Sequence, residues 1–266
     1  MDKIRNTISK FQLPIIVAGT GNVARSVIYA IQQTDINLLG VITRGNDDSI
    51  EYLNKIKTPV FNFNQPVKEP CLCILAVPDC YIESVAKSLN LNKDSILLHT
   101  AGSVGIDVLK SSPYRCGVLY PVQTFHKSKI TDFKNINLCL EADSAETMII
   151  IKQFAEKLKG KIHYIDSLQR LKLHISAVFA CNFSNLMYST AERILKENNI
   201  DFSLLHSLIL ETAHRATKFS PSTIQTGPAI RNDVTTLKKH IENIYGVDNE
   251  IYQLLTQAII GKKFEY

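Results

Sequence analysis

An apolar run passes directly into a glycine-rich turn at Ile15-Ile16-Val17-Ala18-Gly19-Thr20-Gly21-Asn22-Val23-Ala24. This order predicts a strand, a tight turn and the start of a helix. Gly19 permits the turn, Gly21 leaves room for a pyrophosphate against the backbone, and Ala24 lets the helix pack closely on the strand. Free N–H groups at the helix start suit phosphate oxygens. The stretch predicts dinucleotide binding rather than a purely structural turn, and the candidate binding residues are Gly19, Thr20, Gly21, Asn22, Val23 and Ala24.

The end of the second predicted strand, Leu38 to Arg44, indicates which dinucleotide binds. An NAD site usually has Asp or Glu at this place to accept hydrogen bonds from the ribose hydroxyls, whereas this chain has Thr43 and Arg44. Arginine makes charge-assisted contacts to phosphate, and threonine adds a hydroxyl. The two residues therefore favour NADP (NADPH), and the structural alternative is a solvated loop arginine.

Further apolar runs are typical of buried parallel strands, near residues 59–61, 71–77, 95–100, 117–125, 137–140 and 162–165. Ligands of such sheets bind at the carboxyl ends of the strands. The end of the fourth strand is therefore expected to border ribose and nicotinamide, through Ala76, Val77 and Pro78. The loops after the next two strands supply candidate substrate-binding residues, Ser103, Gln123 and Thr124. Asp79 is expected to cap the next helix.

Strand patterns end near Asp166, and long helical patterns follow at residues 167–198, 202–218, 232–245 and 249–260. The predicted fold class is α/β, with an N-terminal Rossmann domain at residues 1–166 whose doubly wound sheet is mostly parallel. Residues 167–266 are predicted to form an all-helical C-terminal domain for substrate binding and dimerisation. Its helices carry many apolar positions, so we expect burial to be completed in a homodimer.

Composition excludes several classes of function. The formal net charge of +5 is spread along the chain rather than gathered in a basic block, so nucleic acid is not an expected partner. No zinc pattern is present in the sequence, and we expect no metal. No apolar run reaches the roughly 18 residues of a membrane span, and residues 1–12 are too polar for a secretory signal. We expect a cytoplasmic protein that binds small anionic ligands and no membrane.

Several motifs, taken in order, resemble a family. They are G-x-G-N-V-A at residues 19–24, A-V-P-D at 76–79, H-T-A-G-S at 99–103, Y-P-V-Q-T-F at 120–125 and T-G-P-A-I-R-N-D at 226–233. The chain is similar over nearly its whole length to bacterial proteins assigned as NADP oxidoreductases, which join a Rossmann-like domain to a helical domain of unknown function. More distantly, it resembles the 6-phosphogluconate dehydrogenase-like enzymes, including ketopantoate reductase, pyrroline-carboxylate reductase and prephenate dehydrogenase. The resemblance implies hydride transfer and helix-mediated dimers.

The candidate catalytic residues are His174 and Asn182, which match the narrower family. The β-hydroxyacid branch has a Lys followed one turn later by Asn, whereas Lys172 is followed by Ser176. On a regular α-helix, His174 and Asn182 would lie about 80° apart and about 12 Å along the axis, so both could line one cleft. We favour His174 as the proton donor, followed by Lys172 and His99. A packed helix histidine, or a structural histidine at the strand end for His99, is the alternative.

The late motif supplies candidate substrate-binding residues, which are Thr226, Gly227, Pro228, Arg231 and Asp233. A rigid turn would aim Arg231 at a carboxylate or phosphate, unless the motif is simply the start of a helix on which Asp233, Thr236 and His240 share a face. The leading hypothesis is an NADPH-dependent reductase acting on a carbonyl or imine of a small acidic substrate. The alternatives are a non-catalytic dinucleotide sensor and a methyltransferase, and Arg44 argues against the latter.

Overall fold

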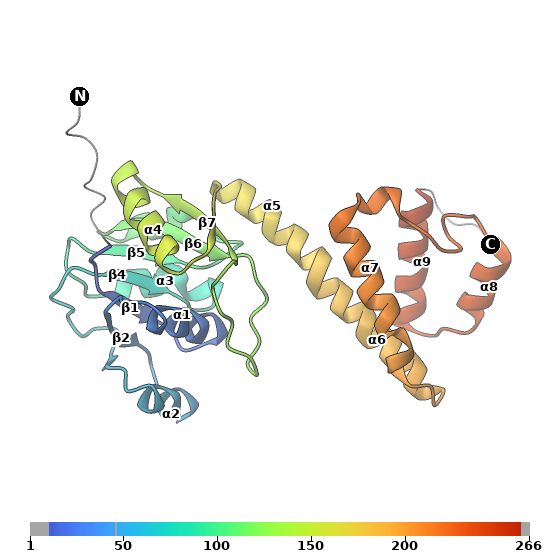
Figure 1. Cartoon of the computed structure of the whole chain (residues 1–266), viewed down its shortest axis with the longest axis horizontal. Helices are drawn as coiled ribbons and strands as arrows, with labels where there is room; N and C mark the ends of the chain where they lie inside the picture. The colour runs from blue at the N-terminus through green and yellow to red at the C-terminus, as the bar shows by residue number, and fades with distance from the viewer. Residues whose placement is uncertain (1–10, 46, 262–266) are drawn as a thin grey trace. The chain divides into compact units, whose positions relative to one another are not determined.

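The computed structural model describes residues 11–45 and 47–261. The chain divides into two compact units, Met1–Phe179 and Ala180–Tyr266, each of which is described by itself. The first unit contains the α/β part of the chain, and the second is helical (Figure 1). The predicted Rossmann-like sheet followed by a helical C-terminal region is confirmed.

Within the described residues, the first unit holds a sheet of eight strands in the order β3-β2-β1-β4-β5-β6-β7-β8. The strands are β1 (Ile15–Ala18), β2 (Leu38–Ile42), β3 (Val60–Phe61), β4 (Leu72–Leu75), β5 (Ile96–His99), β6 (Arg115–Pro121), β7 (Asn137–Ala142) and β8 (Lys161–Tyr164). All neighbouring pairs are parallel except β6 and β7, which are antiparallel. The order reverses between β1 and β4, so the carboxyl ends of these strands form the crevice where such sheets bind ligands.

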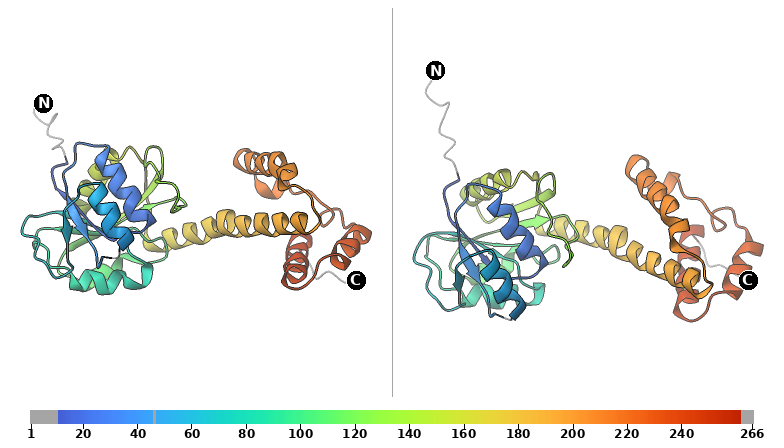
Figure 2. Two further views of the ribbon diagram at one scale, coloured as in Figure 1. Left: turned by 90° about the horizontal axis from the view of Figure 1, so that it is seen from below. Right: turned by 60° about the horizontal axis from the view of Figure 1, so that its bottom comes forward.

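Helices cover both faces of the sheet, as expected for a parallel sheet that is buried on both sides. One face packs against α1 (Asn22–Gln32) and α4 (Ala145–Lys157), with α2 (Asp47–Lys55) at its edge. The other face packs against α3 (Ile82–Ser88) and the 3-10 segment η2 (Ile106–Ser111). Figure 2 shows α1 (blue) and α3 (teal) on opposite sides of the sheet.

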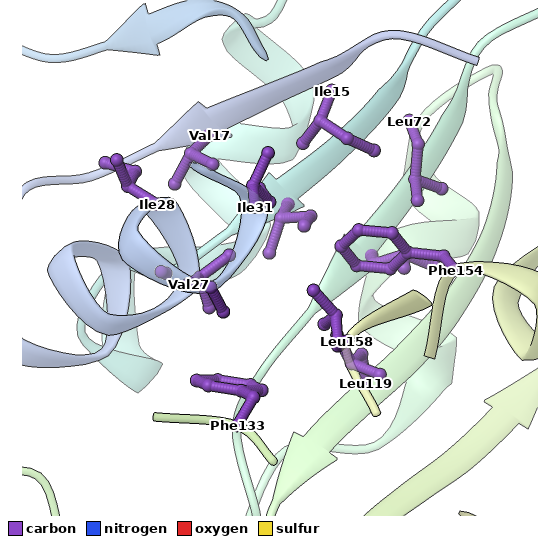
Figure 3. Packing of buried hydrophobic residues seen from close by; sticks show 14 of the residues in the cluster. Ile15, Val17, Val27, Ile28, Ile31, Leu72, Leu119, Phe133, Phe154 and Leu158 are labelled. Atoms are coloured by element: carbon purple, nitrogen blue, oxygen red, sulfur yellow. The ribbon is translucent and has the colours of Figure 1, made fainter. Parts of the chain in front are cut away.

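The core follows from the alternation of side chains along the strands. In β1, Ile15 and Val17 face α1 and α4, whereas Ile16 and Ala18 face α3. Figure 3 shows the first of these layers, in which α1 and α4 side chains interdigitate with strand residues; the labelled residues are Ile15, Val17, Val27, Ile28, Ile31, Leu72, Leu119, Phe133, Phe154 and Leu158. The continuous apolar runs of the sequence are explained by this two-sided burial.

The first unit ends in α5 (Ser167–Ala177), which is fastened to the sheet by a buried ion pair. Arg170 is 1% exposed, and its guanidinium binds the Glu141 carboxylate on β7. Its Nη2 also donates to the Val104 carbonyl at 2.6 Å, and Ser167 Oγ donates to Glu141 at 2.9 Å. A capping box between Asp166 and Gln169 begins the helix.

The predicted domain boundary near Asp166 is the beginning of α5, whereas the two compact units divide between Phe179 and Ala180. The difference has a physical reason, because Arg170 ties α5 to β7 and so includes it in the first unit. The predicted helix at residues 167–198 is three segments: α5, the π-helical η3 (Val178–Phe183) and α6 (Ser184–Glu197).

The second unit continues with α7 (His206–Lys218), α8 (Val234–Glu242) and α9 (Val247–Ile260), together with the short 3-10 segments η4 (Phe202–Leu205) and η5 (Pro221–Thr223). Polar contacts hold these helices together. Arg193 on α6 pairs with Asp248 on α9, and His240 on α8 lies 2.6 Å from the Tyr252 hydroxyl on α9. In the part of the chain that the structure describes, no helix is long and apolar enough to cross a membrane.

Removal of the buried guanidinium is expected to destabilise the first unit. Arg170→Ala leaves Glu141 without its cation and the Val104 carbonyl without its donor, so the free energy of unfolding should fall by about 3–5 kcal/mol. Lys87→Ala is the control because Lys87 pairs with Glu83 on the surface, where it is 53% exposed. Such a pair contributes about 0–1 kcal/mol. Urea denaturation measures both variants, and equal losses would contradict the structural role of Arg170.

Candidate functional site

The candidate site lies at the carboxyl ends of β1, β2, β4 and β5, which are parallel and end at one edge of the sheet. The glycine-rich turn follows β1, Arg44 follows β2, and Pro78 and Gly102 lie in the loops after β4 and β5. Four of the predicted segments are therefore brought together at this edge, although they are far apart in the sequence.

The two glycines of the turn have different roles. Gly19 has φ +120°, and a Cβ at this position would lie 2.3 Å from the Ala76 carbonyl oxygen of the neighbouring strand end. Only glycine fits at this position. Gly21 has an ordinary φ of −70°, and a Cβ there would meet no described atom within 4 Å. The space in front of Gly21 is therefore open on the protein side, as expected for a backbone that a ligand approaches.

The N-terminus of α1 has no side-chain cap among the described residues. Gly21 is its N-cap and offers no side chain, and the first turn contains no acidic residue. In contrast, α4 is capped by Ser144 and α5 by Asp166. The partial positive charge at the start of α1 is thus available to an anion, and Ala24 allows the helix to pack on the sheet as predicted.

The end of β2 places a guanidinium beside two aromatic rings. Arg44 is exposed, and its Cζ lies 6.0 Å from the Phe63 ring centroid and 5.6 Å from that of Tyr81. Both contacts are at cation–π range. Thr43 is buried, and its Oγ1 accepts a hydrogen bond from Gly45 N at 3.2 Å. Its hydroxyl therefore shapes the turn that carries Arg44.

A second arginine at this edge was not predicted from the sequence. Arg25 Nε donates to the Thr20 carbonyl at 3.0 Å, and its Cζ lies 4.6 Å from the Tyr52 ring centroid. Thr20 Oγ1 lies 2.8 Å from Ser49 Oγ on α2. The glycine-rich turn is thus fastened to α2. The contact of Arg25 with Tyr52 depends on where α2 packs, so the sequence gives no signal for it. The position of Arg25 in the first turn of α1 is the one feature that could have indicated a role at this edge.

The loops after β4 and β5 are joined by a hydrogen bond from Ser103 Oγ to the Asp79 carboxylate. The expectation that Asp79 caps the following helix is wrong, since α3 has no side-chain cap among the described residues. Ala76 is buried and its N–H donates to the Ala18 carbonyl, whereas Val77 is half-buried and Pro78 is exposed. Ser103 is therefore held in place by Asp79, close to the strand ends.

The structure shows the surroundings of the two histidines that the sequence offered as proton donors. His174 on α5 is half-buried, and its Nδ1 lies 3.2 Å from the Tyr120 hydroxyl at the end of β6. His99 is fully buried, and its Nδ1 accepts from Ala101 N. Burial and the nearby Arg170 charge lower the pKa of His99 to about 3. Burial and the lowered pKa favour the alternative stated for His99, a structural histidine at the strand end.

The loop after β6 reaches the glycine-rich turn, because Asn22 Nδ2 donates to the Phe125 carbonyl at 3.3 Å. Gln123 and Thr124 are exposed in this loop, and Gln123 Oε1 accepts from Thr124 N at 2.8 Å. Lys172 is also exposed, on α5.

The remaining predicted residues belong to the second unit. Asn182 is exposed and lies within the π-helical segment η3. A π-helix has i→i+5 hydrogen bonds and a wider turn than an α-helix. The angle of about 80° between His174 and Asn182, which assumed a regular α-helix, therefore does not apply. Thr226 and Arg231 are exposed, and Gly227 has φ +111°. Pro228 accepts from Asp233 N at 2.9 Å, and the Asp233 carboxylate caps α8 by accepting from Thr236 N and Oγ1.

In the residues that the structure describes, no group of three or more His, Cys, Asp or Glu side chains could hold a metal ion. The sheet edge thus has the uncapped start of α1 with open space at Gly21, the Arg44 guanidinium at the end of β2, and His174 beside Gly102 in the loop after β5. An uncapped helix start and a guanidinium are groups that suit phosphate oxygens.

Comparisons with other proteins agree with this description. Residues 136–259 match the domain of unknown function DUF2520. No curated protein matches the chain. A presumed NADP oxidoreductase from Bacteroides fragilis is 30% identical, with a TM-score of 0.84 over 94% of this chain and 99% of that chain. A Thermotoga maritima protein is 25% identical, with a TM-score of 0.68 over 92% and 96% of the two chains.

The fold extends to enzymes of low sequence identity. A 1-pyrroline-5-carboxylate reductase from Streptococcus pyogenes is 13% identical, with a TM-score of 0.62 over 95% of this chain and all (100%) of that chain. At this identity, the likeness shows the shared fold and does not assign residues.

Proposed function

Since this chain belongs to the same family as the Bacteroides fragilis protein and contains DUF2520, we propose that it is an NADPH-dependent oxidoreductase. The proposed reaction is transfer of hydride to a carbonyl or imine of a small acidic substrate. The observation that supports it best is the uncapped start of α1, with open space at Gly21, at the same sheet edge as Arg44.

The site residues fit the dinucleotide. The first-turn N–H groups of α1 would hold the pyrophosphate, and Arg44 would bind the 2′-phosphate with Thr43 shaping its turn. Val77 and Pro78 would border the ribose and nicotinamide. When bound, the cofactor supplies hydride. In this proposal, His174 supplies a proton from Nε2 to the carbonyl oxygen or imine nitrogen. Arg231 stays a predicted binding residue for an acidic group.

A dinucleotide sensor without turnover is the second candidate. The observation in its favour is that Lys172 is followed by Ser176, whose hydroxyl donates to the Lys172 carbonyl at 2.9 Å. The Lys and Asn pair of the β-hydroxyacid branch is therefore absent at this position. Steady NADPH oxidation across a panel of keto acids and cyclic imines supports the reductase, and binding without oxidation supports the sensor.

We also propose that the protein is a homodimer formed through its helical unit. Of the described residues of that unit, only Ala229, Leu237 and Thr256 are buried. Large apolar side chains are exposed on α6, α7 and α9, including Leu186, Leu208, Leu210 and Leu254. A hollow of about 470 Å³ between α6 and α7 is lined partly by Tyr188, Phe202, Ile209 and Leu210. Such a surface suits a second copy of the same unit.

The first prediction from this function concerns Gly21. A valine side chain there would occupy the space proposed for the pyrophosphate without touching the protein, so Gly21→Val should weaken NADPH binding by roughly 100-fold or more and leave the melting temperature unchanged. Gly19→Ala is the contrasting variant, because its Cβ would collide with Ala76 and should lower the melting temperature. Calorimetry and thermal unfolding measure the two effects, and unchanged NADPH affinity in Gly21→Val would refute the assignment.

The second concerns cofactor choice. A charge-assisted contact of about 1.5–3 kcal/mol corresponds to roughly ten- to a hundredfold preference for NADPH over NADH, and Arg44→Ala should remove most of it. Arg115→Ala is the matched control, since Arg115 is an exposed arginine at the opposite end of the sheet, where β6 begins. Equal affinities for the two cofactors in the unmodified protein would contradict the role of Arg44.

The third concerns assembly. Light scattering at micromolar concentration should give a mass near twice 29.9 kDa. Leu210 is 70% exposed on α7, and Leu210→Asp should yield the monomer, because a charge in an apolar interface is strongly unfavourable. Ile149→Asp is the control, since Ile149 is 57% exposed on α4 of the first unit. A monomeric unmodified protein would refute the dimer.

A further inference from the structure

We propose that Tyr120 is the positioning residue of His174: its hydroxyl binds Nδ1, so that Nε2 is the nitrogen that faces the ligand. The role of Nε2 as proton donor rests on the proposed reductase function. The hydrogen-bonding role of Tyr120 can be tested separately.

The contact joins two elements that are distant in the sequence. Tyr120 lies at the end of β6 with 8% of its surface exposed, and its hydroxyl oxygen is 3.2 Å from His174 Nδ1 on α5. The two rings meet edge to face, with centroids 6.1 Å apart and planes at 76°. The phenol ring therefore contacts the imidazole both through its hydroxyl and through packing.

Gly102 fixes the same edge of the imidazole from a third element. A Cβ at Gly102 would lie 2.6 Å from His174 Nδ1 and 2.7 Å from its Cγ. Any side chain at residue 102 would displace the ring. The glycine of the H-T-A-G-S motif is thus explained by the close approach of His174 to the loop after β5. With the Nδ1 edge held against Gly102 and Tyr120, Nε2 lies on the other side of the ring.

The helix that carries His174 is itself anchored nearby. Arg170 lies one turn earlier on α5, and its ion pair with Glu141 ties that turn to β7. Residues four apart on an α-helix share a face, so the anchor and the histidine both face the sheet. His174 is consequently held by α5, by β6 and by the loop after β5.

A phenol is a suitable partner for a histidine that changes its proton state. The Tyr120 hydroxyl can accept from Nδ1–H when the ring is charged and can donate to Nδ1 when that nitrogen is bare. Burial raises the pKa of Tyr120, so the phenol keeps its proton and stays neutral. In the transfer step, the Nε2–H bond breaks and an O–H or N–H bond forms on the substrate. The Nδ1–H group keeps its proton and continues to donate a hydrogen bond to the Tyr120 hydroxyl oxygen.

The test uses the imidazole nitrogen signals of the full-length, nitrogen-15-labelled protein. The His174 signals are identified by their loss in His174→Gln. Tyr120→Phe keeps the ring and removes the hydroxyl, so we expect the Nδ1 signal to shift and the proportions of the two neutral tautomers to change. Gly102→Ala should also shift the His174 signals, because the added methyl displaces the ring while Tyr120 stays in place.

Tyr114→Phe is the matched control. Tyr114 is also buried, but its hydroxyl bonds to Leu91 N and the Leu89 carbonyl, away from His174. This variant should lose stability while the His174 nitrogen signals stay unchanged. If Tyr120→Phe leaves the His174 signals as in the unmodified protein, or if Tyr114→Phe shifts them equally, the proposal is overturned.

Calorimetric titration with NADPH separates this inference from the proposed function. Tyr120→Phe should bind NADPH as tightly as the unmodified protein, because Tyr120 lies outside the residues assigned to the cofactor. Failure of the unmodified protein to bind NADPH would sink the reductase proposal and leave the nitrogen signals to decide the role of Tyr120.

Discussion

The buried ion pair between Arg170 and Glu141 fastens helix α5 to strand β7 of the sheet. Arginine is rarely buried without a partner, and a guanidinium taken out of water must be paired and hydrogen-bonded. Glu141 supplies the charge, and the Val104 carbonyl supplies a further acceptor. This constraint fixes the first turn of α5 against β7 and the loop after β5. His174, one turn later, then meets Tyr120 and Gly102. The position of the proposed proton donor therefore depends on a contact that itself takes no part in the chemistry.

The missing side-chain cap at the start of α1 affects the electrostatics of the sheet edge. Within the described residues, α4, α5 and α8 each have an N-cap side chain that accepts from one backbone N–H of the first turn, whereas α3, α6, α7 and α9, like α1, have no side-chain cap. The N-cap of α1 is Gly21, which has no side chain to offer. A capping serine or aspartate usually stabilises a helix by about 1 kcal/mol. The chain forgoes that stabilisation at the start of α1, which follows directly from the glycine-rich turn. An anion that binds both features would supply the missing partners, which is why the uncapped start is the main support for dinucleotide binding.

Local patterns predicted most of the fold, because strand runs, glycines and caps act over a few residues. The turn at Gly19 is of this kind. The contacts that arrange the site act over long separations and left no local signal. Tyr120 and His174 meet only because Arg170 docks α5, Arg25 finds Tyr52 only because α2 packs beside α1, and Asp79 bonds Ser103 across two strand ends. The π-helical turn at Val178–Phe183 was also missed, because a regular 3.6-residue period was assumed across it.

The helical unit buries few apolar side chains of its own among the described residues. Fixing the backbone of each residue opposes folding by about 1–2 kcal/mol, and full burial of a leucine returns only about 1.5–3 kcal/mol. Among the described residues of the unit, Leu237 is the one large apolar side chain that is buried, whereas Leu204, Leu208, Leu210 and Leu254 each remain more than half exposed. The ion pair between Arg193 and Asp248 links α6 to α9, but it buries no apolar side chain. The exposed leucines on η4, α7 and α9 are the observation on which the proposed dimer rests. In the proposed homodimer, a second copy of the unit would cover these side chains, because a two-fold interface uses the same surface of both copies.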